Sequence, residues 1–284
     1  MDGSFDSATG RIRKDGGLPR ALLRWSGIAL TAASWLSAGL FGAYILAFYG
    51  GAVPADRLDQ WNRTLPRLYE PGHPAAALAV GLHFAAGGFI LLAGPVQLMG
   101  AVRLRWPQLH RWIGRTYVVS AGIAGAGGLI YILLNGTIGG LPMNIGFGLY
   151  GALMVLASVQ TYRHARARRF EAHRLWATRL FALAIGSWLY RMDYGFWSLI
   201  ASDAGHTKAF DGPFDVVMAF FFYLPNLALA DLFVRAGKPK AAWLRVPAML
   251  ALMGATFFVL LGTYYFTFYY WLPGIEKAIS GQWE

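Results

Sequence analysis

Two groups of polar residues in this chain have the types and spacing needed for chemistry. Each member of the first group is followed 63 positions later by a residue of the same type: Gln97 and Gln160, His110 and His173, and Arg111 and Arg174. An imidazole can ligate a haem iron or another metal, and the guanidinium fork of Arg matches carboxylate and phosphate groups. The pattern therefore predicts either a haem or metal site or an anion site.

The same separation relates two further arginine pairs in the segments between these residues. Arg103 and Arg105 return as Arg166 and Arg168. Histidine is scarce, with only six in 284 residues, so the composition of the chain alone does not account for its repeat at the same separation. One register that aligns His, Gln and Arg indicates an internal repeat, which we place at residues 75–134 and 145–200. Two simpler explanations stay open. A duplicated hairpin inherits its loop residues, and lipid headgroups select Arg and His beside a membrane span without any ligand.

The composition around these residues is that of an integral membrane protein. The chain is 56% hydrophobic and 15% aromatic, with only 14% charged residues, and a run of roughly 20 apolar residues must form a helix to pair its backbone amides in hydrocarbon. The sequence predicts an all-α fold with about seven transmembrane helices, at residues 25–49, 75–98, 113–134, 145–162, 175–200, 214–234 and 246–271. A kink is expected in the sixth, at Pro225.

The positions of the 25 basic residues predict the orientation of these spans. Nineteen fall in the N-terminal region and in the loops on its side, five fall on the other side, and Arg191 lies alone within a span. By the positive-inside rule, the N-terminus is cytoplasmic and the C-terminus is outside, in a bacterial inner membrane. The net charge of +11 then reflects topology, so we expect lipid partners and no nucleic acid. The chain lacks Cys, which excludes disulfides and Cys-ligated clusters.

The expected domain organisation is a single membrane domain, residues 21–271, between a disordered tail, 1–20, and an outer tail, 272–284. Its centre should be a four-helix bundle built from two tandem parallel helical hairpins. This arrangement places His110 and His173 on diagonal helices, near the cytoplasmic face. The candidate cofactor-binding residues there are His110, His173, Arg111, Arg174, Arg115, Arg179, Gln97 and Gln160.

A second polar group is expected near the outer side of the bundle. Ionisable side chains within a span are costly unless they are paired, so they indicate a functional site by default. A pair near the interface whose charged ends reach water is the simpler explanation. The residues of this outer polar site are His83, Arg191, Asp193, Tyr190 and Tyr194.

The order and spacing of these residues resemble an uncharacterised bacterial family of predicted membrane proteins, a domain of unknown function. The resemblance covers about residues 75–195 and implies fold and localisation, but no activity. The layout also resembles the four-helix bundle of transmembrane cytochromes b, except that His83 has Gly146 as its repeat equivalent instead of a second His. The residues that carry the family resemblance are His83, Gly94, Pro95, Gln97, His110, Arg111, Gly114, Arg115, Tyr117, His173, Arg174, Trp176, Arg179 and Arg191.

Two functions are compatible with this pattern. The first is a redox protein with one b-type haem between His110 and His173, in which arginines hold the propionates and electrons exchange with a quinone or small reductant at the outer site. The alternative is a cofactor-free membrane transporter or binder of an anionic lipid or organic anion. An enzyme acting on lipids is disfavoured, because the chain lacks a His-Glu-x-x-His helix and a Gly-x-Ser-x-Gly elbow.

Overall fold

The computed structural model describes residues 17–63, 69, 71–72 and 74–282, and these residues form helices and no strand. Residues 1–16 of the expected tail lie outside this part of the chain. The elements are α1 (Gly17–Tyr44), η1 (Ile45–Gly50), η2 (Leu58–Arg63), α2 (Pro74–Leu98), α3 (Gly100–Arg105), α4 (Pro107–Asn135), α5 (Gly140–Arg166), α6 (Phe170–Ala201), α7 (Pro213–Phe221), α8 (Leu224–Ala236), η3 (Pro239–Leu244), α9 (Arg245–Phe266), η4 (Thr267–Trp271) and α10 (Leu272–Ser280).

The long helices coincide with the apolar runs of the sequence, and the all-α membrane architecture is confirmed. Among the described residues, five helical stretches are long and apolar enough to cross a membrane without help from their surroundings. They are Gly17–Gly50, Pro107–Leu134, Gly140–Arg166, Pro213–Ala236 and Pro239–Ser280. The other two expected spans are α2, which contributes the shorter apolar stretch Ala85–Leu98, and α6, whose 32 residues include Arg179, Arg191 and Asp193.

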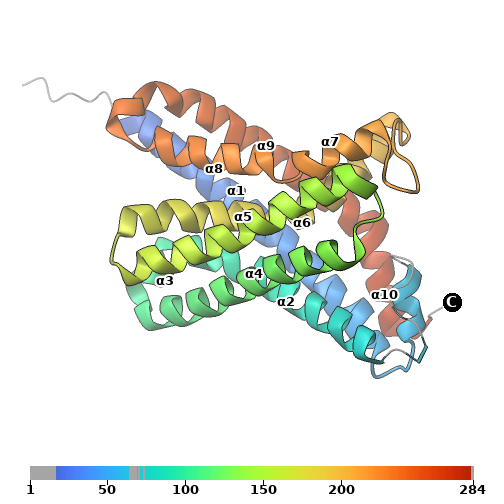
Figure 1. Cartoon of the computed structure of the whole chain (residues 1–284). Coiled ribbons are helices and arrows are strands. Elements are labelled where there is room, and N and C mark those ends of the chain that lie inside the picture. Colours follow the sequence, from blue (N-terminus) through green and yellow to red (C-terminus); the bar gives the residue numbers. More distant parts are fainter. Residues whose placement is uncertain (1–16, 64–68, 70, 73, 283–284) are drawn as a thin grey trace, which may run out of the picture.

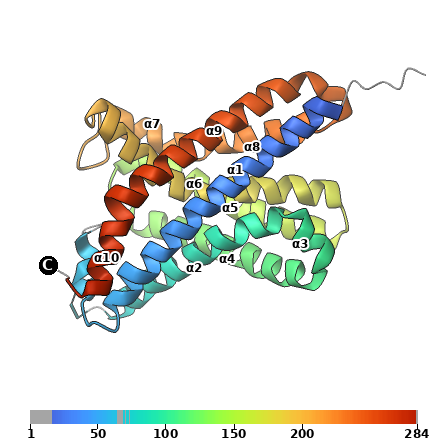
Figure 2. The ribbon, with the colours of Figure 1, turned by 180° about the vertical axis from the view of Figure 1, so that it is seen from behind.

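Four of these helices form a closed bundle. Helix α4 packs against α2 and α5, and α6 packs against the same two helices, so that α4 and α6 lie diagonally opposite. The centre of the bundle is filled by Tyr117 of α4, Met154 of α5 and Leu180 of α6, which are almost fully buried. A second layer, formed by α1, α8 and α9, crosses one side of the bundle (Figures 1 and 2).

Glycine allows the closest of these helix contacts. Helices α4 and α5 approach each other at Gly125 and Gly151, where a Cβ added to Gly125 would lie 3.0 Å from the carbonyl oxygen of Gly151. Small residues are the usual means by which membrane helices pack, because lipid offers no hydrophobic gain on helix association. The two helices are therefore held at backbone contact in the middle of the bundle.

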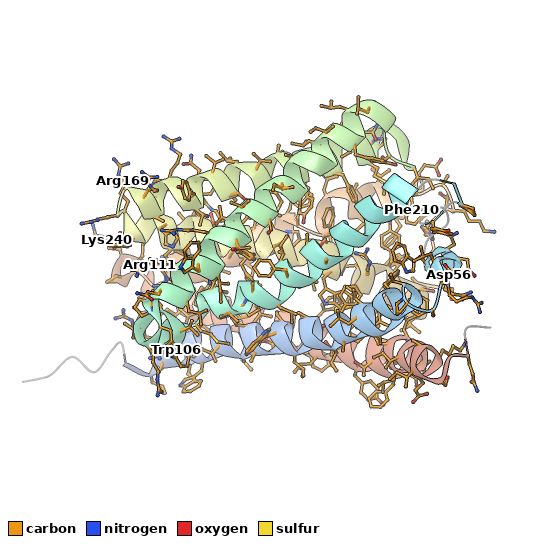
Figure 3. All side chains as sticks on the ribbon, turned by 90° about the horizontal axis from the view of Figure 1, so that it is seen from below. Asp56, Trp106, Arg111, Arg169, Phe210 and Lys240 are labelled. Carbon is orange, nitrogen blue, oxygen red and sulfur yellow. The ribbon has the colours of Figure 1, made fainter. Side chains whose placement is uncertain are left out.

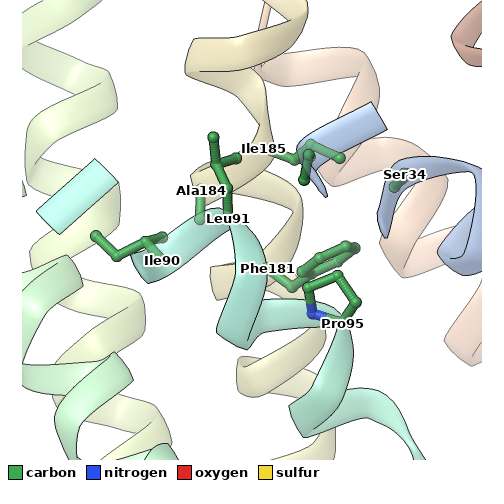
Figure 4. Close-up of a pocket in the computed structure, with 8 residues that line it drawn as sticks. Ser34, Ile90, Leu91, Pro95, Phe181, Ala184 and Ile185 are labelled. Atoms are coloured by element: carbon green, nitrogen blue, oxygen red, sulfur yellow. The ribbon is translucent and has the colours of Figure 1, made fainter. Parts of the chain in front are cut away.

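Proline lies inside one helix and at the break in another span. Helix α2 continues through Pro95, and a cavity about the size of one water molecule lies beside this residue, between α2, α1 and α6 (Figure 4). The sixth span breaks between α7 and α8, just before Pro225, as the expected kink requires. There the side-chain amide of Asn226 donates to the carbonyl of Phe222 at 2.7 Å, which satisfies a backbone group freed by the break.

The helices run between two ends of different charge. One end, which we call the basic end, holds α3, the turn between α5 and α6, and η3 (Figure 1). Trp106, Arg111, Arg169 and Lys240 mark it in Figure 3, whereas Asp56 and Phe210 lie at the opposite end. Because α1 begins at the basic end, 16 of the 21 basic residues in the described part of the chain belong to this side.

Candidate functional site

The two His of the repeat occupy the same position in their helices. Helices α4 and α6 begin at Pro107 and Phe170, which are themselves 63 positions apart. The backbone N–H of His110 donates to the carbonyl of Trp106 at 3.0 Å, and that of His173 to the carbonyl of Arg169 at 2.9 Å. Both His therefore lie in the first turn of diagonal helices, at the basic end.

Both imidazoles belong to the faces that line the bundle. Tyr117 and Leu180 are each seven residues, or about two turns, further along the same faces and are buried in the core. The Nδ1 atom of His173 lies 3.0 Å from the carbonyl oxygen of Thr161 on α5. A ring that donates from Nδ1 keeps Nε2 free for a ligand. The Nδ1 atom of His110 is buried and has no hydrogen-bond partner.

Four more polar side chains at this end of the bundle are buried and have no partner among the described residues. They are the Gln97 amide nitrogen of α2, the Tyr117 hydroxyl of α4, and the Ser158 and Thr161 hydroxyls of α5. Native proteins satisfy the large majority of such groups, and each unsatisfied one costs about 1–3 kcal/mol. We call Gln97, His110, Tyr117, Ser158, Thr161 and His173 the buried polar layer.

Glycine places Gln97 within this layer. A Cβ added to Gly114 of α4 would lie 2.8 Å from the Gln97 carbonyl oxygen, so any larger residue would displace the amide. A Cβ on Gly94 of α2 would lie 3.3 Å from the Tyr117 hydroxyl. These two glycines hold side chains of α2 and α4 against one another between the apolar core and the basic end.

Arginines surround the mouth of the layer. The charges of Arg103 and Arg111 act on His110, and the two imidazoles are close enough for their own charges to interact. The side chains of Arg111 and Arg174 are exposed, and Figure 3 shows Arg111 at the basic end. The buried polar layer therefore lies beneath a positively charged rim.

The remaining residues predicted for this site have other surroundings. Arg179 forms a bidentate pair with Asp231 of α8, with N···O distances of 2.8 and 2.7 Å, and stacks over Trp176. Arg115 is exposed and stacks over Trp112, and Gln160 is half-buried. The structure thus brings Gln97, His110 and His173 together and places the arginines around or outside them.

At the opposite end, two of the residues predicted for the outer site join a network centred on Asp215. Tyr190 donates to Tyr194 at 3.1 Å, and Tyr194 donates to the carboxylate of Asp215 at 2.7 Å. The same carboxylate lies 2.7 Å from Nδ1 of His206 and accepts from the backbone N–H groups of Thr207 and Gly212, both at 3.0 Å. Its side chain is fully buried and fully hydrogen-bonded.

The other residues of the predicted outer site are not joined to this network. Arg191 donates to the backbone carbonyl of Ser187 at 2.9 Å, one turn earlier in α6, and Asp193 is half-buried on the same helix. His83 lies within α2, but its side chain is outside the described part of the chain. The structure therefore does not describe a partnership between His83 and Arg191.

The pattern in the sequence did not single out five residues of the two clusters. At the basic end these are Ser158 and Thr161, and Tyr117, which was noted only as part of the family resemblance. The usable signal was spacing, because Ser158 and Thr161 are polar residues on the same face of α5 as Met154. At the opposite end, His206 and Asp215 are separated by a loop that carries no periodic pattern.

A multi-ligand metal site is not supported. Within the described residues, no three His, Cys, Asp or Glu side chains come close enough to hold a metal ion.

The family described as "Predicted membrane protein (DUF2306)" matches residues 80–234, which is more than half of the chain. The chain belongs to this family. No curated protein and no solved structure is detectably similar to it.

Proposed function

We propose that this membrane protein binds an anionic ligand, an organic anion or the phosphate of an isoprenoid lipid, in the buried polar layer. One observation carries the proposal: side chains from α2, α4 and α5 present hydrogen-bonding groups to the bundle interior that no atom in the described part of the chain satisfies. Three hydroxyls and the amide nitrogen of Gln97 are all able to donate. Donors beneath a rim of arginines are complementary to the oxygens of a carboxylate or phosphate.

The burial of these donors favours a ligand that enters and leaves. A structural role would be served better by apolar side chains, because buried donors without acceptors destabilise the protein. An anion that accepts from several of them recovers this free energy only when it is bound. We therefore favour a binding or transport protein over a redox protein.

The test is thermal unfolding of the detergent-purified protein with farnesyl monophosphate or citrate added at saturating concentration. A ligand at 100 times its Kd stabilises by about 2.7 kcal/mol, which is roughly 5–10 °C in Tm for a chain of this size. Gly114→Ala should abolish most of this shift, because the new Cβ displaces Gln97. Gly128→Ala is the matched control, since a Cβ there meets nothing within 4 Å. No shift with either probe, or an equal shift in Gly114→Ala, would contradict the proposal.

A haem held by His110 and His173 is the second candidate, and the diagonal placement of the two His is the observation that favours it. The contact of His173 with the Thr161 carbonyl orients the ring as metal ligands are commonly oriented. The exposed arginines at the rim would meet the propionates, and a haem would supply one-electron chemistry. The buried donors fit this group less well, because the flat faces of a macrocycle accept no hydrogen bonds from them.

A reduced-minus-oxidised absorbance spectrum separates the two candidates. Sharp Soret and α bands that disappear in both His110→Ala and His173→Ala would establish the haem and replace the anion proposal. A featureless spectrum from protein expressed with ample haem would remove the cytochrome. Retained bands in both variants would show that any haem lies elsewhere.

We also propose a topology in which the basic end is cytoplasmic. This end carries most of the arginines and lysines, which supports its retention in the cytoplasm of a bacterial cell, and the C-terminus would then lie outside the inner membrane. The ligand would then enter the buried polar layer from the cytoplasm. Labelling of single cysteines introduced at Lys240 and Lys208 with an impermeant thiol reagent tests this, and labelling of the Lys240 site in intact cells would contradict it.

A further inference from the structure

The seam between α4 and α5 at the basic end carries two arginines stacked on aromatic rings. The Arg115 guanidinium lies 5.2 Å from the ring centre of Trp112, one turn earlier in α4. The Arg166 guanidinium lies 5.9 Å from the ring of Tyr162, one turn earlier in α5, and donates to its hydroxyl at 3.3 Å. The stacking fixes two otherwise flexible cations in place.

These two pairs belong to one surface. Helices α4 and α5 run antiparallel, with Gly125 against Gly151 and Gly122 against Ser158, so Arg115 and Tyr162 lie at similar levels of the seam, one to two turns nearer the basic end. The charge of Arg115 accordingly acts on Tyr162 across the boundary between the helices. All four side chains are exposed, and no carboxylate is paired with either arginine among the described residues. Two fixed and unneutralised cations on adjacent helices form a site for a phosphate.

The surface continues along the helices as an apolar track. Val119 and Ile123 follow Arg115 on the same face of α4 and are 58% and 68% exposed. Leu156 and Val159 precede Tyr162 on the same face of α5 and are 43% and 48% exposed. The change from cation to aromatic to aliphatic side chains matches the order of phosphate, glycerol and acyl chain in a phospholipid.

The equivalent seam of the repeat lacks this surface. At the positions of Arg115 and Trp112, 63 residues later, α6 has Thr178 and Leu175. At the positions of Tyr162 and Arg166, 63 residues earlier, the chain has Met99, just after α2, and Arg103. The equivalent seam therefore keeps one arginine but lacks both aromatic rings and the counterpart of Arg115. Attraction between headgroups and basic loops would act on both seams, so the aromatic and arginine pairs on one of them call for a more specific explanation.

We propose that the α4–α5 seam is a binding site for one anionic phospholipid, with its phosphate between Arg115 and Arg166 and its acyl chains along Val119 and Val159. The site faces the membrane, outside the bundle, and it is separate from the buried polar layer. The proposal therefore does not depend on the function proposed for that layer.

Native mass spectrometry of the full chain from nanodiscs of mixed phosphatidylglycerol and phosphatidylcholine tests this site. Retained phosphatidylglycerol should fall about 25-fold in Arg115→Gln/Arg166→Gln, at about five-fold per arginine. The charge-matched control is Arg168→Gln/Arg169→Gln, which removes two exposed arginines from the same end of the molecule. This control should retain the lipid.

The two variants distinguish a built site from general attraction. An equal loss in both would overturn the proposal, because net charge alone would then hold the lipid. Retention in both would also overturn it. Since all four arginines are exposed, both variants should unfold at the temperature of the parent chain, and a selective loss of Tm in Arg115→Gln/Arg166→Gln would assign these arginines a structural role instead. Farnesyl monophosphate should stabilise both variants equally, which separates this site from the buried layer.

Discussion

Two polar clusters of the protein, the Asp215 network and the buried polar layer, differ in how far their buried polar groups are hydrogen-bonded. In the Asp215 network, one carboxylate accepts hydrogen bonds from a tyrosine, a histidine and two backbone N–H groups, and among the described residues none of the network's buried side-chain atoms is without a partner. The buried polar layer at the basic end contains five polar atoms that have no partner in the described part of the chain. A network in which every buried polar group is hydrogen-bonded stabilises the fold, whereas buried groups without a partner can still form hydrogen bonds to a ligand.

The largest expected effect is in the Asp215 network. Asp215→Asn keeps the shape of the side chain but directs an amide at backbone N–H groups and removes the charge that the other donors surround. We expect a loss of about 3 kcal/mol, or roughly 6–12 °C in Tm, from thermal unfolding. Asp211→Asn is the control, because Asp211 is exposed and bonded only locally, to Thr207. Equal losses in the two variants would mean that the Asp215 network is not the source of the stability.

Removal of one hydroxyl from each of the two clusters should change the free energy of unfolding in opposite directions. Tyr194→Phe deletes a donor to Asp215 and should destabilise the protein by about 1–2 kcal/mol. Thr161→Val replaces an unpartnered hydroxyl by a methyl group of similar volume and should stabilise the ligand-free protein by about 1 kcal/mol. Thermal unfolding without ligand measures both.

The same Thr161→Val variant should gain less stability from farnesyl monophosphate than the parent chain does. A variant that is more stable without ligand but binds the ligand more weakly indicates that the native residue serves ligand binding rather than stability. A destabilised Thr161→Val would instead show that its hydroxyl already has a partner in the folded protein, and the contrast between the two clusters would lose its basis.

The smallest effect is expected at the ion pair that lies outside both clusters. Arg179 and Asp231 have side chains that are 25% and 24% exposed, so solvent and lipid headgroups screen their attraction. Arg179→Gln should cost no more than about 1 kcal/mol in thermal unfolding and should leave the response to farnesyl monophosphate unchanged. A smaller stabilisation by farnesyl monophosphate would show that Arg179 contributes to ligand binding, as the sequence pattern predicts.

Much of the fold could be predicted from the sequence, because a membrane helix is determined by the apolar residues of its own segment. The apolar run at 113–134 lies within α4, and the run at 175–200 lies within α6. The 63-residue register also gave the diagonal placement of the two His, since equal spacing along helices of a closed bundle fixes their relative position. What it could not give was the short helix α3, which forms within a polar loop.

The candidate site was less predictable, because side-chain partners depend on contacts between distant segments. Arg179 and Asp231 are 52 residues apart, and nothing in either local pattern relates them. Tyr194 and Asp215 meet across the loop from 202 to 212. The packing of the whole bundle decides which polar groups have no partner. The sequence therefore indicated the His and Gln residues of the buried polar layer but not its hydroxyl groups.

The contacts of α1 set an order of assembly during synthesis. This helix is made before α6 and α9, yet it packs against α9 along much of its length, and its buried Ser37 accepts a hydrogen bond at 3.0 Å from the indole of Trp188 in α6. Neither partner exists when α1 leaves the ribosome. The first helix must therefore wait in the lipid while the bundle forms, and it reaches its final place only when the last long helix enters the membrane.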